Sequence, residues 1–253
     1  MIGAIAAGIA AGFVLGLLGA GGTIVGLPFL LYLVALSPHR VLGTNALGVA
    51  FAALALLAVR IWRRRLPLAP GLTFALPGLV GIYLGGRLGL TFPGRQLVFL
   101  LGFLVFVVAA WMFYLSTRSA AAPSQESFPL FAPLTRQRVL LLAPTALVVG
   151  AVAGFFAIGG GFLIVPALML VGGLELAEAA AAALVPIAAF ALLVGAEYAS
   201  SGQVAFGLAV IMALAGLIGG LFGIGLGARL PKKRLQQVFA LLLVAIGIYM
   251  LAR

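Results

Sequence analysis

Hydrophobic residues along this chain form long stretches that are separated by short polar gaps. The pattern predicts apolar segments at residues 2–18, 23–36, 41–59, 69–90, 95–116, 139–157, 161–174, 179–197, 204–227 and 235–252. Most of them approach the roughly 20 residues with which a helix crosses a bilayer. The pattern therefore predicts an all-α polytopic membrane protein whose two halves contain equal numbers of segments.

A glycine-rich break followed by a proline interrupts the start of each half. Residues 16–28 read GLLGAGGTIVGLP and residues 154–166 read GFFAIGGGFLIVP, at an offset of 138 residues. Glycines within an apolar run open a helix, and inside a membrane the freed backbone groups must face protein, water or a ligand. Paired interruptions at matching places in two halves point to the binding site of a secondary transporter.

A second similarity between the halves indicates a duplication. Residues 81–89 (GIYLGGRLG) match residues 223–231 (GIGLGARLP) at an offset of 142, which makes Arg87 and Arg229 equivalent. Together the similarities predict a first membrane repeat at 1–117, a cytoplasmic linker at 118–137 and a second membrane repeat at 138–253.

The charges at segment ends indicate how the repeats are oriented. The short segments 2–18 and 23–36 could form one broken helix, a re-entrant hairpin or two short spans. A single crossing gives parallel copies and divides the Lys and Arg residues eight against seven across the membrane, whereas zero or two crossings give inverted copies and divide them eleven against four. Because cytoplasmic loops carry the excess of Lys and Arg, this favours inverted repeats, each opening with a Gly-broken or re-entrant helix pair.

Composition narrows the class of protein further. Of 253 residues, 65% are hydrophobic and 8% charged, with a mean hydropathy of +1.32. The net charge of +11 lies between apolar runs, where membrane orientation and lipid headgroups explain it better than nucleic acid. There is no cysteine, there is one histidine, and no H-E-x-x-H or G-x-S-x-G motif occurs. We therefore expect no enzymatic activity, no metal site and no cofactor.

These features, in this order, resemble the TauE/SafE-type sulfite exporter family, also called TSUP. The glycine breaks, GTNALG at residues 43–48 and the G-x-x-x-G-x-R-L segments carry the resemblance over nearly the whole chain. It implies a multi-pass permease of the prokaryotic inner (plasma) membrane that moves a small anion, with protons as a candidate coupling ion. The second half has AAALVP at residues 181–186 in place of GTNALG, so we expect most polar contacts to come from the first half.

The glycine breaks are the candidate substrate site. A helix start presents unpaired N–H groups and the positive end of the macrodipole to an anion, and we expect helices to restart at about Thr23 and Gly161. The glycines could instead serve close helix packing, and Thr44 and Asn45 could cap a helix. The candidate substrate-binding residues are Gly21, Gly22, Thr23, Thr44, Asn45, Gly159, Gly160 and Gly161.

Few ionisable residues lie within the apolar segments. Glu197 is the coupling candidate because ionisable groups in membrane segments are costly, although its place near a segment end also suits an interfacial role. Glu175 and Glu178 suit the start of a helix. Arg87 and Arg229 could select anions or snorkel to the membrane surface.

The sequence thus predicts a secondary transporter, expected to be an exporter, of a small anion such as sulfite or an organosulfonate. It would work by alternating access, with the substrate held at the breaks. A passive anion channel is the alternative, which the lack of a continuous polar stripe disfavours. A membrane-embedded enzyme is a third, which the missing catalytic groups disfavour.

Overall fold

The computed structural model describes residues 1–34, 36–62, 68–118 and 136–227, together with positions 229, 237, 241, 244, 245, 247 and 248. The predicted linker between the repeats, the arginine run at 63–65, most of the basic run at 229–234 and most of the predicted segment 235–252 lie outside these residues. The helices are α1 (Ile2–Leu18), α2 (Gly22–Leu33), α3 (Pro38–Trp62), α4 (Leu68–Thr91), α5 (Gly94–Arg118), α6 (Arg136–Phe155), α7 (Gly161–Leu170), α8 (Leu176–Ala182), α9 (Leu184–Ser200) and α10 (Phe206–Gly227).

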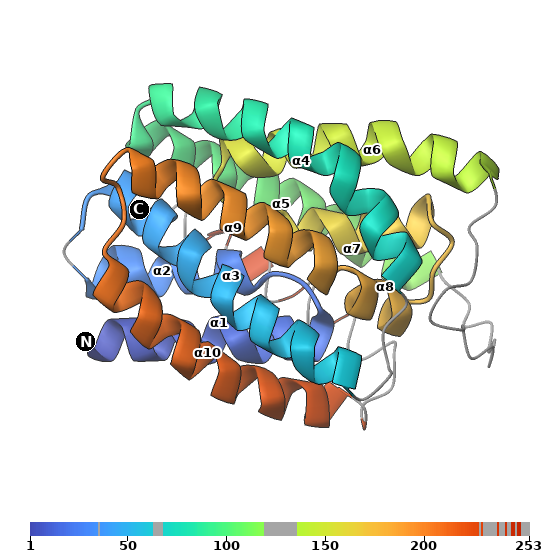
Figure 1. Cartoon of the computed structure of the whole chain (residues 1–253). Coiled ribbons are helices and arrows are strands. Elements are labelled where there is room, and N and C mark those ends of the chain that lie inside the picture. The colour runs from blue at the N-terminus through green and yellow to red at the C-terminus, as the bar shows by residue number, and fades with distance from the viewer. Residues whose placement is uncertain are drawn as a thin grey trace.

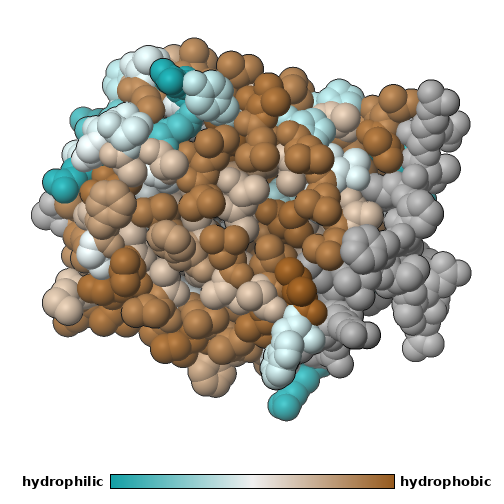
Figure 2. Space-filling model, viewed as in Figure 1, coloured by the Kyte–Doolittle hydropathy of each residue, from teal (hydrophilic) through white to brown (hydrophobic). Residues whose placement is uncertain are grey.

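The predicted all-α membrane architecture is confirmed. Within the described residues, five helical stretches are long and apolar enough to cross a membrane, namely Pro38–Trp62, Leu68–Thr91, Arg138–Phe155, Leu176–Ser200 and Phe206–Gly227. The face seen in Figure 2 is apolar across its middle, and its hydrophilic side chains gather mainly at the left end of the view. An apolar band of this kind suits contact with lipid tails.

The first two helices of each half form an antiparallel hairpin. Gly3 at the start of α1 lies against Leu33 near the end of α2, while Gly22 at the start of α2 lies near Leu15 near the end of α1. In the second half the Arg138 side chain, from α6, lies beside Gly173, which follows α7. Each hairpin returns the chain to the end where it began, so the pair is not one broken helix that crosses once. At about 1.5 Å per residue, α2 spans roughly 18 Å, less than the hydrocarbon core.

Helix packing relates the two halves by a constant offset of 138 residues. α1 packs along α10, and α6 packs along α4 (Figure 1). Gly85 lies on Ala151, and Gly223 lies on Phe13, so each residue of one contact is 138 positions from its counterpart in the other. The same relation links Gly81–Leu147 with Gly219–Ile9, Gly89–Phe155 with Gly227–Leu17, and Gly150–Gly78 with Gly12–Gly216.

The offset of 142 that the sequence suggested for α4 and α10 is therefore wrong by one helical turn. Glycine recurs at four-residue intervals along both helices, so sliding one over the other by four positions again matches glycine to glycine. In the structural register Arg87 corresponds to Gly225, and Arg229 corresponds to Thr91. The two arginines are not equivalent.

Contacts at the helix glycines also fix helix directions. α1, α3 and α10 run parallel to one another, as do α4, α6 and α9, because contact positions rise together along each pair. α3 and α9 are antiparallel, since Gly43 lies beside Tyr198 and Gly195 beside Leu47. Equivalent helices therefore run in opposite directions, as an inverted repeat requires. The rising pairs are Gly8–Met212 with Gly16–Gly220, Gly48–Met212 with Gly220–Leu56, Gly81–Leu147 with Gly89–Phe155, and Gly71–Val185 with Gly86–Glu197.

Candidate substrate site at the glycine breaks

The first break holds two glycines in the left-handed region. Gly19 ends α1 with φ +63°, and Gly21 precedes α2 with φ +78°. Glycine adopts such angles without the clash that a Cβ would cause. α2 then begins at Gly22, one residue before the predicted restart, and its first backbone N–H groups have no partner within the helix.

The second break has the same backbone conformation despite its different sequence. Ala157 and Gly159 have φ +54° and +58°, and they stand 138 residues after Gly19 and Gly21. Gly160, with φ +72°, precedes α7, which begins at Gly161 as predicted. An alanine with positive φ is uncommon. The surrounding structure therefore imposes this turn where the sequence lacks the third glycine.

The two breaks meet inside the protein. A Cβ on Gly161 would lie 3.2 Å from the backbone nitrogen of Gly21, and the Thr23 hydroxyl donates a hydrogen bond to the Ile158 carbonyl. α2 and α7 both begin here and run toward opposite ends of the protein. The positive ends of both helix dipoles therefore converge on one place.

Asn45 on α3 joins this cluster. Its Nδ2 donates to the Thr23 carbonyl oxygen at 2.8 Å. Its Oδ1 is buried and has no hydrogen-bond partner within the described residues, and it fills the space beside Gly26. Both Thr23 and Asn45 are buried. The structure thus brings together Asn45 and all the candidate residues of the breaks.

Thr44 points elsewhere. Its hydroxyl accepts a hydrogen bond of 2.9 Å from the backbone nitrogen of Ala205, which precedes α10. Because α3 begins at Pro38, Thr44 and Asn45 lie inside the helix, and the alternative that they cap its start is wrong. Thr44 instead ties α3 to the loop that follows α9.

Glu197 lies away from the breaks, between α9 and α4. Only 9% of its surface is exposed, and the carboxyl group rests against Gly86. Neither carboxyl oxygen has a hydrogen-bond partner in the part of the chain that is described. The glycine at position 86 is the partner that sequence reasoning missed, because nothing in the sequence links it to Glu197. By contrast, Glu175 and Glu178 form a capping box at the start of α8, as expected for carboxylates at a helix start.

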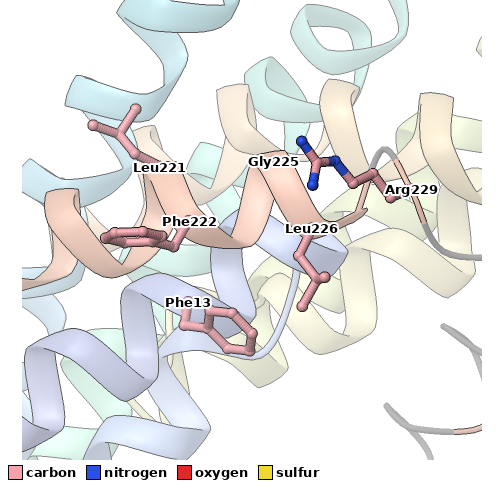
Figure 3. A pocket seen from close by; sticks show the side chains of 6 residues that line it. All are labelled: Phe13, Leu221, Phe222, Gly225, Leu226 and Arg229. Atoms are coloured by element: carbon pink, nitrogen blue, oxygen red, sulfur yellow. The ribbon is translucent and has the colours of Figure 1, made fainter.

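A cavity of about 380 Å³ lies on the outer side of α1 and α10, well apart from the breaks (Figure 3). Phe222 on its wall is exposed, so the cavity faces the region where lipid is expected. Because Thr23 and Asn45 are buried, an anion can reach the breaks only when the surrounding helices move. The residues that line the cavity are Phe13, Leu221, Phe222, Gly225, Leu226 and Arg229.

Comparisons with known proteins agree with this architecture. A family model described as "Sulfite exporter TauE/SafE" matches residues 4–250. A "Probable membrane transporter protein" of Xylella fastidiosa (strain Temecula1) is 35% identical over 249 residues, which cover 96% of this chain and 91% of that protein. The "Probable membrane transporter protein YunE" of Bacillus subtilis (strain 168) is 25% identical over 254 residues, which cover 95% and 93%. No solved structure matches.

Proposed function

This chain belongs to the TauE/SafE sulfite exporter family of membrane transporters, and from that premise we propose that it exports a small anion such as sulfite or an organosulfonate. The substrate is held where the two glycine breaks meet. The observation that carries this proposal is the convergence of the starts of α2 and α7 beside Gly21 and Gly161.

The chemistry of the breaks suits an oxyanion. Two helix starts present backbone N–H groups and the positive ends of two dipoles, which favour negative charge without a buried arginine. The glycines leave the backbone open to close approach by a ligand. An anion that enters would replace the contact between the Thr23 hydroxyl and the Ile158 carbonyl as the bridge between the halves.

The polar side chains of this site come from the first repeat. Thr23 and Asn45 correspond, 138 residues later, to Gly161 and Ala183, neither of which has a polar side chain. The site is therefore asymmetric within a symmetric backbone. We propose that the backbone N–H groups of both halves bind the anionic oxygens and that Asn45 sets their orientation.

Alternating access follows from the way the helices are grouped. α1, α3 and α10 form one parallel group, and α4, α6 and α9 form another, so each group contains helices of both repeats. The groups meet mainly through α3 and α9. Rocking of one group against the other would open the breaks first to one side of the membrane and then to the other, as in other transporters with inverted repeats.

The test is flux of radiolabelled sulfite, and of a small panel of organosulfonates, in proteoliposomes with an imposed pH gradient switched on and off. We expect uphill accumulation that Gly160→Leu abolishes, since a leucine cannot adopt the backbone angles of Gly160. Gly207→Leu is the matched control, because a Cβ there meets no atom within 4 Å. Flux that only dissipates an anion gradient would indicate a passive channel, and no flux of any anion would contradict the substrate class.

A further inference from the structure

We propose that Glu197 is the proton-binding site that couples anion transport to a proton gradient, and that Gly86 provides the niche for its protonated carboxyl group. The coupling part of this inference rests on the proposed transport function. The assignment of the proton site does not.

The niche is formed by the absence of a side chain on α4. A Cβ on Gly86 would lie 3.1 Å from the Glu197 Cδ and would collide with its Oε2. The carboxyl group therefore occupies the position that any larger residue at 86 would fill. Since α4 belongs to the first repeat and α9 to the second, this contact joins the two repeats.

The surroundings of Glu197 favour the neutral carboxyl group. The side chain is 91% buried, counting from its 9% exposed surface, and both oxygens lack hydrogen-bond partners among the described residues. A charged acidic residue within a membrane helix costs about 2.5–3.5 kcal/mol on insertion scales. Binding a proton removes that cost, so the packed state holds the proton.

The cation nearest along α4 is turned away from Glu197. The Arg87 guanidinium donates a hydrogen bond of 3.0 Å to the Tyr83 hydroxyl and lies 5.3 Å from the centre of the Tyr83 ring. Arg87 still acts on Glu197 electrostatically. When the carboxyl group loses its proton, Arg87 is the partner toward which the carboxylate can turn.

Two other titratable groups lie at this end of the bundle. Tyr198, the next residue on α9, is buried and its hydroxyl has no hydrogen-bond partner in the described structure. His39 on α3 has its ring centre 6.1 Å from that of Tyr198, and its Nε2 pairs with the Phe92 carbonyl oxygen at 3.0 Å. Neither bonds to the Glu197 carboxyl group, which leaves Glu197 as the proton-binding group of this end.

α9 connects the proton site with the substrate site. A Cβ on Gly159 would lie 3.0 Å from the Cβ of Ala191, and Glu197 lies about 9 Å further along the same helix at 1.5 Å per residue. Loss of the proton draws the carboxylate out of the niche toward Arg87 and loosens α9 from α4. The shift reaches the second break through Ala191, so proton release and anion release are coupled.

The proton site can be tested without transport, by infrared difference spectroscopy of the whole protein in lipid nanodiscs during a pH titration. We expect the carbonyl stretch of a protonated carboxyl group that disappears at high pH and is missing from Glu197→Gln. Arg87→Gln should move the transition to higher pH, because it removes the cation that favours the carboxylate. Glu178→Gln, which changes a carboxylate in the α8 capping box, should leave the band unchanged. A band that survives in Glu197→Gln, or its absence from the wild type, would overturn the assignment.

Coupling is tested with the same variants in proteoliposomes. We expect Glu197→Gln to keep exchange of labelled for unlabelled sulfite but to lose accumulation driven by a pH gradient at least tenfold. Accumulation that persists in Glu197→Gln, or that follows a sodium gradient instead, would overturn the coupling role. If the wild-type protein exchanges no anion, the proposed function fails, and the infrared result still decides the proton site.

The niche is tested by Gly86→Ala with Gly207→Ala as the control, since a Cβ at position 207 meets nothing within 4 Å. We expect Gly86→Ala to lose pH-driven accumulation and to shift the pH at which the carboxyl band disappears. Gly207→Ala should behave as the wild type in both measurements. Equal behaviour of the two variants would contradict the niche.

Discussion

The hydroxyl group of Thr23 donates a hydrogen bond to the carbonyl oxygen of Ile158, 135 residues away in sequence. The bond joins the glycine break of the first repeat to that of the second. A threonine hydroxyl at the start of a helix would usually cap that helix. Here it bridges the two halves, and in this closed arrangement the bridge occupies the place proposed for the anion.

Replacing Thr23 with valine tests this bridge. The substitution keeps the shape of the side chain but leaves the buried Ile158 carbonyl oxygen without its donor, which costs about 1–3 kcal/mol. We expect a lower thermal unfolding temperature in detergent and weaker sulfite exchange in proteoliposomes. Thr23→Ser, which retains the hydroxyl group, should preserve exchange; equal loss in both variants would assign the effect to packing.

Replacing Ala157 with glycine should stabilise the protein. The left-handed conformation of Ala157 costs an ordinary L-residue about 1–2 kcal/mol, and part of the gain is offset by the greater freedom of glycine in the unfolded chain. We expect a net increase in the free energy of unfolding of roughly 0.5–1 kcal/mol, measured by denaturant titration in detergent.

Ala146→Gly provides the comparison for this prediction. Ala146 lies within α6, where glycine lowers helix stability by about 1 kcal/mol relative to alanine. Destabilisation by both substitutions would contradict the interpretation that Ala157 is held in an unfavourable conformation.

The packing of α1 on α10 depends on Gly12. A Cβ on Gly12 would collide with the carbonyl oxygen of Gly216, as expected where small residues let membrane helices approach closely. Gly12→Val should therefore abolish folded, monodisperse protein in size-exclusion chromatography, or lower its unfolding temperature by more than any other valine substitution tested. Gly207→Val, on a part of α10 where a Cβ meets no neighbour, should elute as the wild type.

Membrane orientation is open to direct measurement because the chain contains no cysteine. Single cysteines at Trp62 and Ser201 would lie at opposite ends of the bundle, at the ends of the antiparallel helices α3 and α9. The excess of positive charge predicts that Trp62→Cys faces the cytoplasm. We expect a membrane-impermeant maleimide, added to intact cells, to label Ser201→Cys only. Labelling of Trp62→Cys alone would reverse the orientation.

Several features of the fold could be predicted from local sequence. Glycine clusters within apolar runs forecast the breaks, and α7 begins at Gly161 as expected. The division of charge favoured an inverted repeat, and the contacts give equivalent helices the opposite directions that it requires. These predictions succeeded because each depends on short segments, whose hydrophobicity and backbone freedom are local properties.

The equivalence of Arg87 and Arg229 could not be judged in the same way. A helix with glycine at every fourth position resembles itself after a shift of one turn, so sequence alone supports two registers. The choice is made where Gly85 lies on Ala151 and Gly223 lies on Phe13. Backbone contact of this kind permits only one register, because a shift by a turn would place larger side chains against the neighbouring helix.

The sequence by itself determined that the chain is an apolar, duplicated helical protein with broken helices at matching places, because these properties depend on residue type and order along the chain. Only the tertiary structure decided that the breaks face one another, that Asn45 reaches the Thr23 carbonyl while Thr44 turns toward Ala205, and that Glu197 rests on Gly86. Each of these relationships joins segments far apart in sequence. They arise because close packing of glycine-lined helices leaves few positions where a polar side chain fits.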